Sequence, residues 1–127
     1  MPKRILIADD SPTERRIFQR ALSPLGHEIL MAVDGSEAER MVRAERPDLL
    51  VLDVVMPGKN GFALCRELKS DPDHAAMPIV IVTSKDQDAD QFWGRRQGAD
   101  EYLVKPFEPP ALVAACRRLL GEPAEEA

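Results

Sequence analysis

The sequence predicts a doubly wound α/β domain with a five-stranded parallel sheet and five helices. Two aliphatic runs, 49–52 and 79–82, contain no polar residue at alternate positions, which is typical of strands covered on both faces. Three weaker apolar runs, 4–8, 27–33 and 101–104, alternate along the chain with segments of helical periodicity. This alternation favours parallel strands joined by right-handed crossovers, with helices on both faces of the sheet.

The helices are predicted from capping residues and apolar periodicity, with starts near residues 11, 36, 60, 88 and 109. Ser11 caps the first helix, Glu14 completes its capping box, and Gly26 ends it. Ser36 and Glu39 form a second capping box. Each helix therefore has its own local start signal.

The helix expected over residues 88–97 is the weakest of the five. Only Ala89, Phe92 and Trp93 form its apolar stripe, and Gly94 costs about 1 kcal/mol relative to alanine. We expect this helix to be the most mobile. Trp93 has two open interpretations, a core residue for this thin helix or an anchor for a partner.

Length and composition indicate one domain over 1–121 and an acidic flexible tail over 122–127, in a chain of 127 residues. No apolar run could span a membrane, and no secretory signal is present, so we expect a cytoplasmic protein with no membrane partner. The net charge of −5 argues against nucleic-acid binding and favours a protein partner. Cys65 and Cys116 are expected to be small buried hydrophobes, and His27 and His74 to be surface or loop residues.

The flavodoxin-like strand order 2-1-3-4-5 brings the acidic pair Asp9–Asp10 next to Asp53, because parallel strands end at the same edge of the sheet. Three carboxylates in one shallow pocket favour a hard cation such as Mg²⁺. Thr83 and Lys105 follow the fourth and fifth strands and point to the same rim. A hydroxyl and a fixed cation beside a metal suit a phosphoryl group.

Each of these residues also has a simpler explanation. Asp9 and Asp10 could cap the first helix, and Asp53 could be a loop carboxylate. Thr83 could be a β-branched strand end, and Lys105 could be a solvated lysine. However, each of the four strand ends carries a group that a phosphoryl site requires. This combination favours a shared site.

The chain resembles the receiver domain of two-component response regulators over essentially its whole length. The matching features are Asp9–Asp10, Asp53 with 56–58 behind it, Thr83, and Tyr102 with Lys105–Pro106. The resemblance implies that Asp53 accepts a phosphoryl group from a histidine kinase as an acyl phosphate.

The resemblance also implies a Mg²⁺ site. Asp10, Asp53 and the backbone carbonyl of Val55 would bind the ion directly, and Asp9 would act through water. Such a chain is not an enzyme acting on a separate substrate, although it is expected to catalyse its own dephosphorylation.

The remaining implied roles concern switching. Lys105 would pair with the phosphoryl oxygens, Thr83 would move to bond one of them, and Tyr102 would turn inward in response. The bond between Lys105 and Pro106 is similar to one that is cis in this family. The switch would change the face formed by the fourth helix, fifth strand and fifth helix.

No further domain follows Gly121, so the sequence predicts a stand-alone receiver whose output is contact with an unidentified downstream protein. We expect a monomer or a weak, phosphorylation-dependent dimer.

A narrower resemblance links the chain to single-domain regulators of type IV pilus twitching motility, which are run by a chemotaxis-like kinase. It rests on three segments, 11–14, 84–87 and 93–99. Val55 and Lys85 depart from the flagellar-motor chemotaxis regulators at positions that flank the path of the hydrolytic water.

Two other functions remain as alternatives. An Mg²⁺-dependent phosphatase with an aspartate nucleophile would carry an acid two residues after the nucleophile, where this chain has Val55. A receiver-like scaffold that binds partners without phosphorylation would be favoured by a missing pocket residue, and none is missing.

Overall fold

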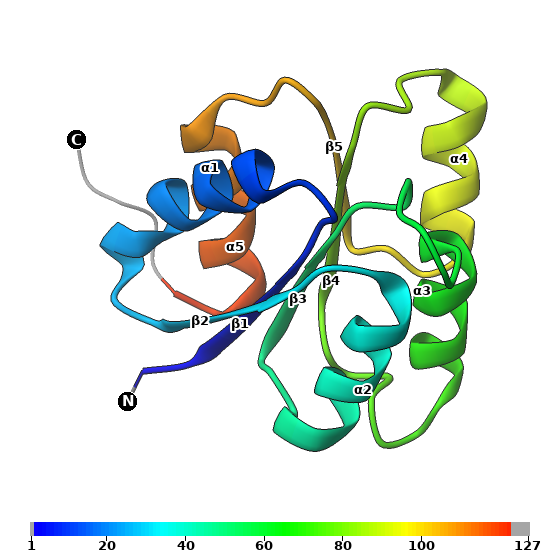
Figure 1. Ribbon diagram of the computed structural model, residues 1–127, viewed down its shortest axis with the longest axis horizontal. Coiled ribbons are helices and arrows are strands. Elements are labelled where there is room, and N and C mark those ends of the chain that lie inside the picture. Colours follow the sequence, from blue (N-terminus) through cyan, green and yellow to red (C-terminus); the bar gives the residue numbers. More distant parts are fainter. Residues whose placement is uncertain (1, 123–127) are drawn as a thin grey trace.

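The computed structural model describes residues 2–122 and confirms the predicted sheet. Five parallel strands lie in the order β2-β1-β3-β4-β5 (Figure 1). The strands are β1 (Arg4–Ala8), β2 (Glu28–Ala32), β3 (Leu49–Leu52), β4 (Ile79–Thr83) and β5 (Glu101–Val104). The central strand is therefore β3, whose four residues are all buried.

Helices cover both faces of the sheet, as Figure 1 shows: α1 and α5 lie on one face, and α2, α3 and α4 on the other. Their bounds are α1 (Pro12–Leu22), α2 (Gly35–Glu45), α3 (Gly61–Ser70), α4 (Asp88–Arg96) and α5 (Pro109–Leu119). A short 3₁₀ helix, η1 (Ser23–Leu25), separates α1 from Gly26, which has φ 78°. Among the described residues no helix is long and apolar enough to cross a membrane.

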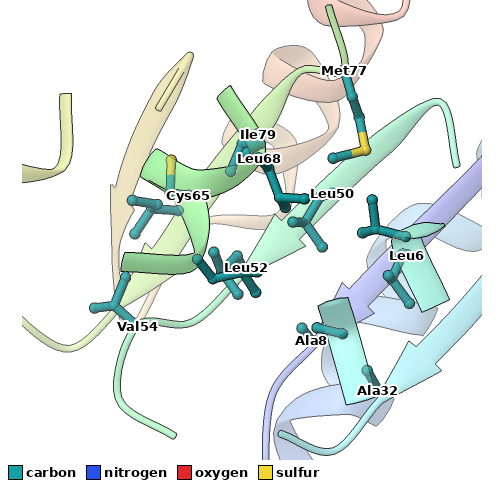
Figure 2. Packing of buried hydrophobic residues seen from close by; sticks show 14 of the residues in the cluster. Leu6, Ala8, Ala32, Leu50, Leu52, Val54, Cys65, Leu68, Met77 and Ile79 are labelled. Atoms are coloured by element: carbon teal, nitrogen blue, oxygen red, sulfur yellow. The ribbon is translucent and has the colours of Figure 1, made fainter. Parts of the chain in front are cut away.

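Alternate residues of each strand enter two separate hydrophobic clusters. Leu50 and Leu52 of β3 pack with Leu68 of α3 on one face (Figure 2), while Leu49 and Val51 pack on the opposite face against α1 and α5. Because both faces of the sheet are covered, the central strands need apolar residues at every position.

Both cysteines are buried in these clusters, as predicted: Cys65 lies on the α3 side and Cys116 on the α5 side. Burial raises the pKa of each thiol to about 12.

The predicted capping box of α2 is wrong by two residues. Asp34, not Ser36, caps the helix by accepting a hydrogen bond from the backbone N–H of Glu37 (2.8 Å). The Glu37 carboxylate in turn accepts from the N–H of Val33 (2.9 Å). Both pairs match the capping pattern, and the structure contains the earlier one.

Both histidines lie in loops, but neither is a surface residue. His74 is buried. The His27 ring accepts a hydrogen bond from the N–H of Lys3 at Nδ1, and its Nε2 lies 2.9 Å from Glu122. Glu122 is the first residue of the predicted tail, and the other tail residues, 123–127, lie outside the described part of the chain.

The expected apolar stripe of α4 faces solvent. Phe92 is 65% exposed and Trp93 51% exposed, whereas the sheet side of α4 carries Gly94 and Gln97. Trp93 is therefore not a core residue. The mobility of α4 stays a prediction.

Gly94 has a packing role that its helix propensity does not reveal. A Cβ at this position would lie 2.8 Å from two ring carbons of Tyr102, closer than real Cβ contacts allow. Tyr102 itself is buried. The missing side chain of Gly94 thus makes room for the Tyr102 ring between β5 and α4.

Replacing Gly94 with alanine should lower the free energy of unfolding by about 1–3 kcal/mol, because the clash with Tyr102 outweighs the gain in helix propensity. Urea denaturation of Gly94→Ala measures this. In a Tyr102→Ala background the same change should instead be stabilising. A stabilised Gly94→Ala in the wild-type background would contradict the packing role.

Candidate functional site

The site lies at the carboxyl edge of the sheet, where backbone hydrogen bonds extend past the strand ends. The N–H of Asp53 donates to the carbonyl of Ala8 (3.0 Å), and the N–H of Lys105 donates to the carbonyl of Thr83 (2.8 Å). The first of these bonds continues the pairing of β1 with β3, and the second that of β4 with β5. Asp53 and Lys105 are therefore placed by the sheet itself.

The centre of the site is the ammonium group of Lys105. Its Nζ donates to Asp9 Oδ2 at 2.7 Å and to Asp53 Oδ2 at 3.0 Å. The Lys105 side chain is 12% exposed and that of Asp9 only 1%. Burial lowers the pKa of Lys105, but the hydrogen bonds to Asp9 and Asp53 outweigh it, so the pKa is raised above its ordinary value. The lysine is thus a fixed cation between two carboxylates.

The two other carboxylate contacts explain why the acidic side chains keep their positions. Asp53 Oδ1 accepts a hydrogen bond from the N–H of Val55 (2.9 Å), and Asp9 Oδ1 accepts from the N–H of Ser11 (2.9 Å). Asp10 is different, since it is exposed and makes no hydrogen bond or ion pair with any residue in 2–122. A carboxylate without such contacts is available for a ligand.

The oxygen atoms around Asp10 fit a hard cation. Asp10 lines two adjacent hollows, one of about 350 Å³ that it shares with Val55, and one of about 490 Å³ that it shares with Asp9 and Asp53. Within residues 2–122 no three His, Cys, Asp or Glu side chains converge as a metal cluster. The Mg²⁺ ligands expected from the sequence are two carboxylates and the carbonyl oxygen of Val55, and this set needs no third acidic side chain. All three ligands are oxygen atoms, which Mg²⁺ prefers.

Thr83 and Tyr102 occupy buried positions beside this edge. The Thr83 hydroxyl is buried and has no hydrogen-bond partner among the described residues, which is unusual for a buried polar group. The Tyr102 hydroxyl donates to the backbone carbonyl of Lys85 in the loop before α4 (2.8 Å). Burial, followed by nearby acidic charges, raises the pKa of Tyr102 to about 12. The Lys105–Pro106 peptide bond is cis, as the resemblance implies.

The lining of the larger hollow also includes residues that were not predicted from the sequence as site residues. Ser84 and Glu14 both line it beside Asp53 and Lys105. The sequence assigned Glu14 to a capping box, but only half of that box forms: the Ser11 hydroxyl accepts from the N–H of Glu14 (3.2 Å), while the Ser11 N–H is bound by Asp9. Glu14 follows Asp10 by four residues and lies in the first turn of α1, and this short spacing is the signal that could have placed it here.

The chain belongs to the response regulator receiver domain family, whose model matches residues 5–117. It is similar to Protein PilH of Pseudomonas aeruginosa, with 44% identity over 93% of this chain and 98% of that protein. This similarity agrees with the narrower resemblance to pilus regulators. The chain spans about half the length of several other curated relatives, which are named as transcriptional or response regulators.

Solved structures support the same family. A response regulator from Chloroflexus aurantiacus superposes with a TM-score of 0.91 at 33% identity, covering 96% of this chain and 100% of that one. The receiver domain of a sensor histidine kinase from Pseudomonas aeruginosa, with a magnesium ion coordinated in its active-site cleft, superposes with a TM-score of 0.86 at 25% identity and the same coverage. Receiver domains take phosphoryl groups from histidine kinases, and an aspartate acceptor with Mg²⁺ is general in the family.

Lys105→Met should lower the free energy of unfolding by about 1–3 kcal/mol at pH 7, because Asp9 and Asp53 lose the cation between them. The pKa of Lys105 is raised above its ordinary value, so the lysine carries this charge throughout the neutral range. Urea denaturation at pH 7 measures the deficit. Lys85→Met, which removes an exposed lysine, is the control, and equal effects of the two substitutions would contradict this assignment.

Proposed function

We propose that this chain is a response regulator that is phosphorylated on Asp53 and signals through its α4-β5-α5 face. The observation that carries the proposal is the Asp53 carboxylate held 3.0 Å from Lys105 at the sheet edge, next to Asp10, which has no partner within residues 2–122. A nucleophilic carboxylate, a fixed cation and a free metal-ligating carboxylate are together the groups that phosphoryl transfer requires.

In the proposed reaction a carboxylate oxygen of Asp53 attacks the phosphorus of a phosphohistidine on the kinase. A P–O bond to Asp53 forms while the P–N bond breaks, and the imidazole nitrogen keeps the electron pair. Asp10, Asp53 and the Val55 carbonyl would hold Mg²⁺, with Asp9 acting through water, and the ion would supply positive charge beside the transferred group. Lys105 is close enough to Asp53 to pair with the new phosphoryl oxygens.

Thr83 and Tyr102 then relay the change. The Thr83 hydroxyl lacks a hydrogen-bond partner among the described residues, so a phosphoryl oxygen would offer an acceptor that the buried group needs. Movement of Thr83 at the end of β4 alters the space beside Tyr102, whose hydroxyl holds the loop before α4 through Lys85. Phosphorylation thereby shifts the population of α4 positions.

The output surface combines charged and apolar side chains. On the α4-β5-α5 face, Glu101 of β5 pairs with Arg95 of α4 (3.3 Å) and Arg118 of α5 (2.8 Å). Phe92 and Trp93 extend from α4 into solvent beside it. Exposed aromatic side chains on a movable helix suit a downstream protein or a weak phosphorylation-dependent dimer.

The similarity to PilH supports a place in type IV pilus twitching motility, downstream of a chemotaxis-like histidine kinase in the cytoplasm. The chain turns over no separate substrate in this role. It catalyses loss of its own phosphoryl group, at a rate that Val55 and Lys85 influence because both line the hollow next to Asp10.

The test is incubation with acetyl phosphate and Mg²⁺, followed by intact-mass spectrometry and Trp93 fluorescence. We expect a mass gain of one phosphoryl group and a change in the fluorescence of Trp93, the only tryptophan in the chain. Asp53→Asn, which keeps the side-chain shape, should fold and show no mass gain. Saturable Mg²⁺ binding without any mass gain in the wild type would support the scaffold function instead.

A further inference from the structure

Glu14 lies in the first turn of α1 with its carboxylate directed toward the phosphorylation site. Its Oε1 is 3.8 Å from Lys105 Nζ, and its side chain is 32% exposed. The capping role that would have occupied this carboxylate is taken by Asp9, which binds the Ser11 N–H. Glu14 is therefore free to act on the hollow that it lines.

The hollow holds an excess of negative charge. Asp9, Asp10, Glu14 and Asp53 contribute four carboxylates to its lining, against the single ammonium of Lys105. A divalent cation would leave this set with one excess negative charge, and Glu14 supplies that excess. Without Glu14, the site loaded with Mg²⁺ would be formally neutral.

A carboxylate at this place acts in opposite directions on the two species that must enter. It attracts Mg²⁺ and repels an anionic phosphodonor, because both interactions follow the sign of the charge. Glu14 is partly exposed, so solvent screens each effect to a few-fold change at moderate ionic strength.

We propose that Glu14 is a specificity-determining residue of the phosphorylation site, which strengthens Mg²⁺ binding and slows phosphorylation by small free dianionic phosphodonors. The inference rests on the proposed function, because it concerns access to Asp53. Glu14 does not touch the reacting atoms in this role. It acts through the charge of the cleft and through its contact with Lys105.

The test compares the wild type with Glu14→Gln, which removes the charge and keeps the shape. Isothermal titration calorimetry should show Mg²⁺ binding about two- to fivefold weaker, while phosphorylation by acetyl phosphate at saturating Mg²⁺ should become about two- to fivefold faster. Both differences should shrink at high salt. Phosphoramidate carries less negative charge, so Glu14→Gln should increase the rate of phosphorylation by phosphoramidate less than the rate with acetyl phosphate.

Asp73→Asn is the matched control. It makes the same charge change in an exposed loop between α3 and β4, at the opposite edge of the sheet. It should leave both Mg²⁺ affinity and phosphorylation rate unchanged, and circular dichroism should show that both variants fold.

The outcomes separate this inference from the proposed function. A wild-type chain that gains no phosphoryl group would overturn the proposed function itself. A wild-type chain that is phosphorylated, with Glu14→Gln unchanged in both measurements, would overturn the role of Glu14 alone. Weaker Mg²⁺ binding together with slower phosphorylation would also overturn it, because that result would mean that Glu14 only maintains the shape of the site.

Discussion

One ammonium group stabilises the carboxyl edge of this domain. Lys105 pairs with both Asp9 and Asp53, which would otherwise face each other as two largely buried anions, and it is brought there by the pairing of β5 with β4. One ammonium balances only one of these two negative charges, and Asp10 and Glu14 line the same hollow, so the edge keeps a surplus of negative charge. A cation can enter such a site readily, and a new phosphoryl group would compete with the carboxylates for the same ammonium.

The connection from this edge to the surface depends on close packing behind it. Tyr102 fills the space left by Gly94 and reaches the carbonyl of Lys85, so β5, α4 and the loop before α4 share one aromatic side chain. Thr83 lies at the end of the strand that β5 pairs with. Because α4 places Phe92 and Trp93 in solvent instead of the core, few apolar contacts hold it, which is a property expected of an element that moves.

The sequence predicted the sheet, its strand order and the meeting of Asp9, Asp53 and Lys105, because long aliphatic runs and strand ends are local signals. Side-chain direction depended on contacts between distant segments and was predicted less well. Phe92 and Trp93 of α4 face solvent because the side of the helix at Gly94 packs against Tyr102, a residue of β5. Glu14 matched a capping pattern, but Asp9 supplied the competing acceptor.

A double-mutant cycle of Asp9→Asn and Lys105→Met, measured by urea denaturation at pH 7, tests the central interaction most directly. If the ammonium stabilises the charged Asp9 carboxylate, then Asp9→Asn should stabilise the Lys105→Met protein, in which Asp9 has lost this cation. The same substitution should not stabilise the wild type. We predict a coupling energy of about 1–3 kcal/mol. Additive effects of the two substitutions would contradict the account.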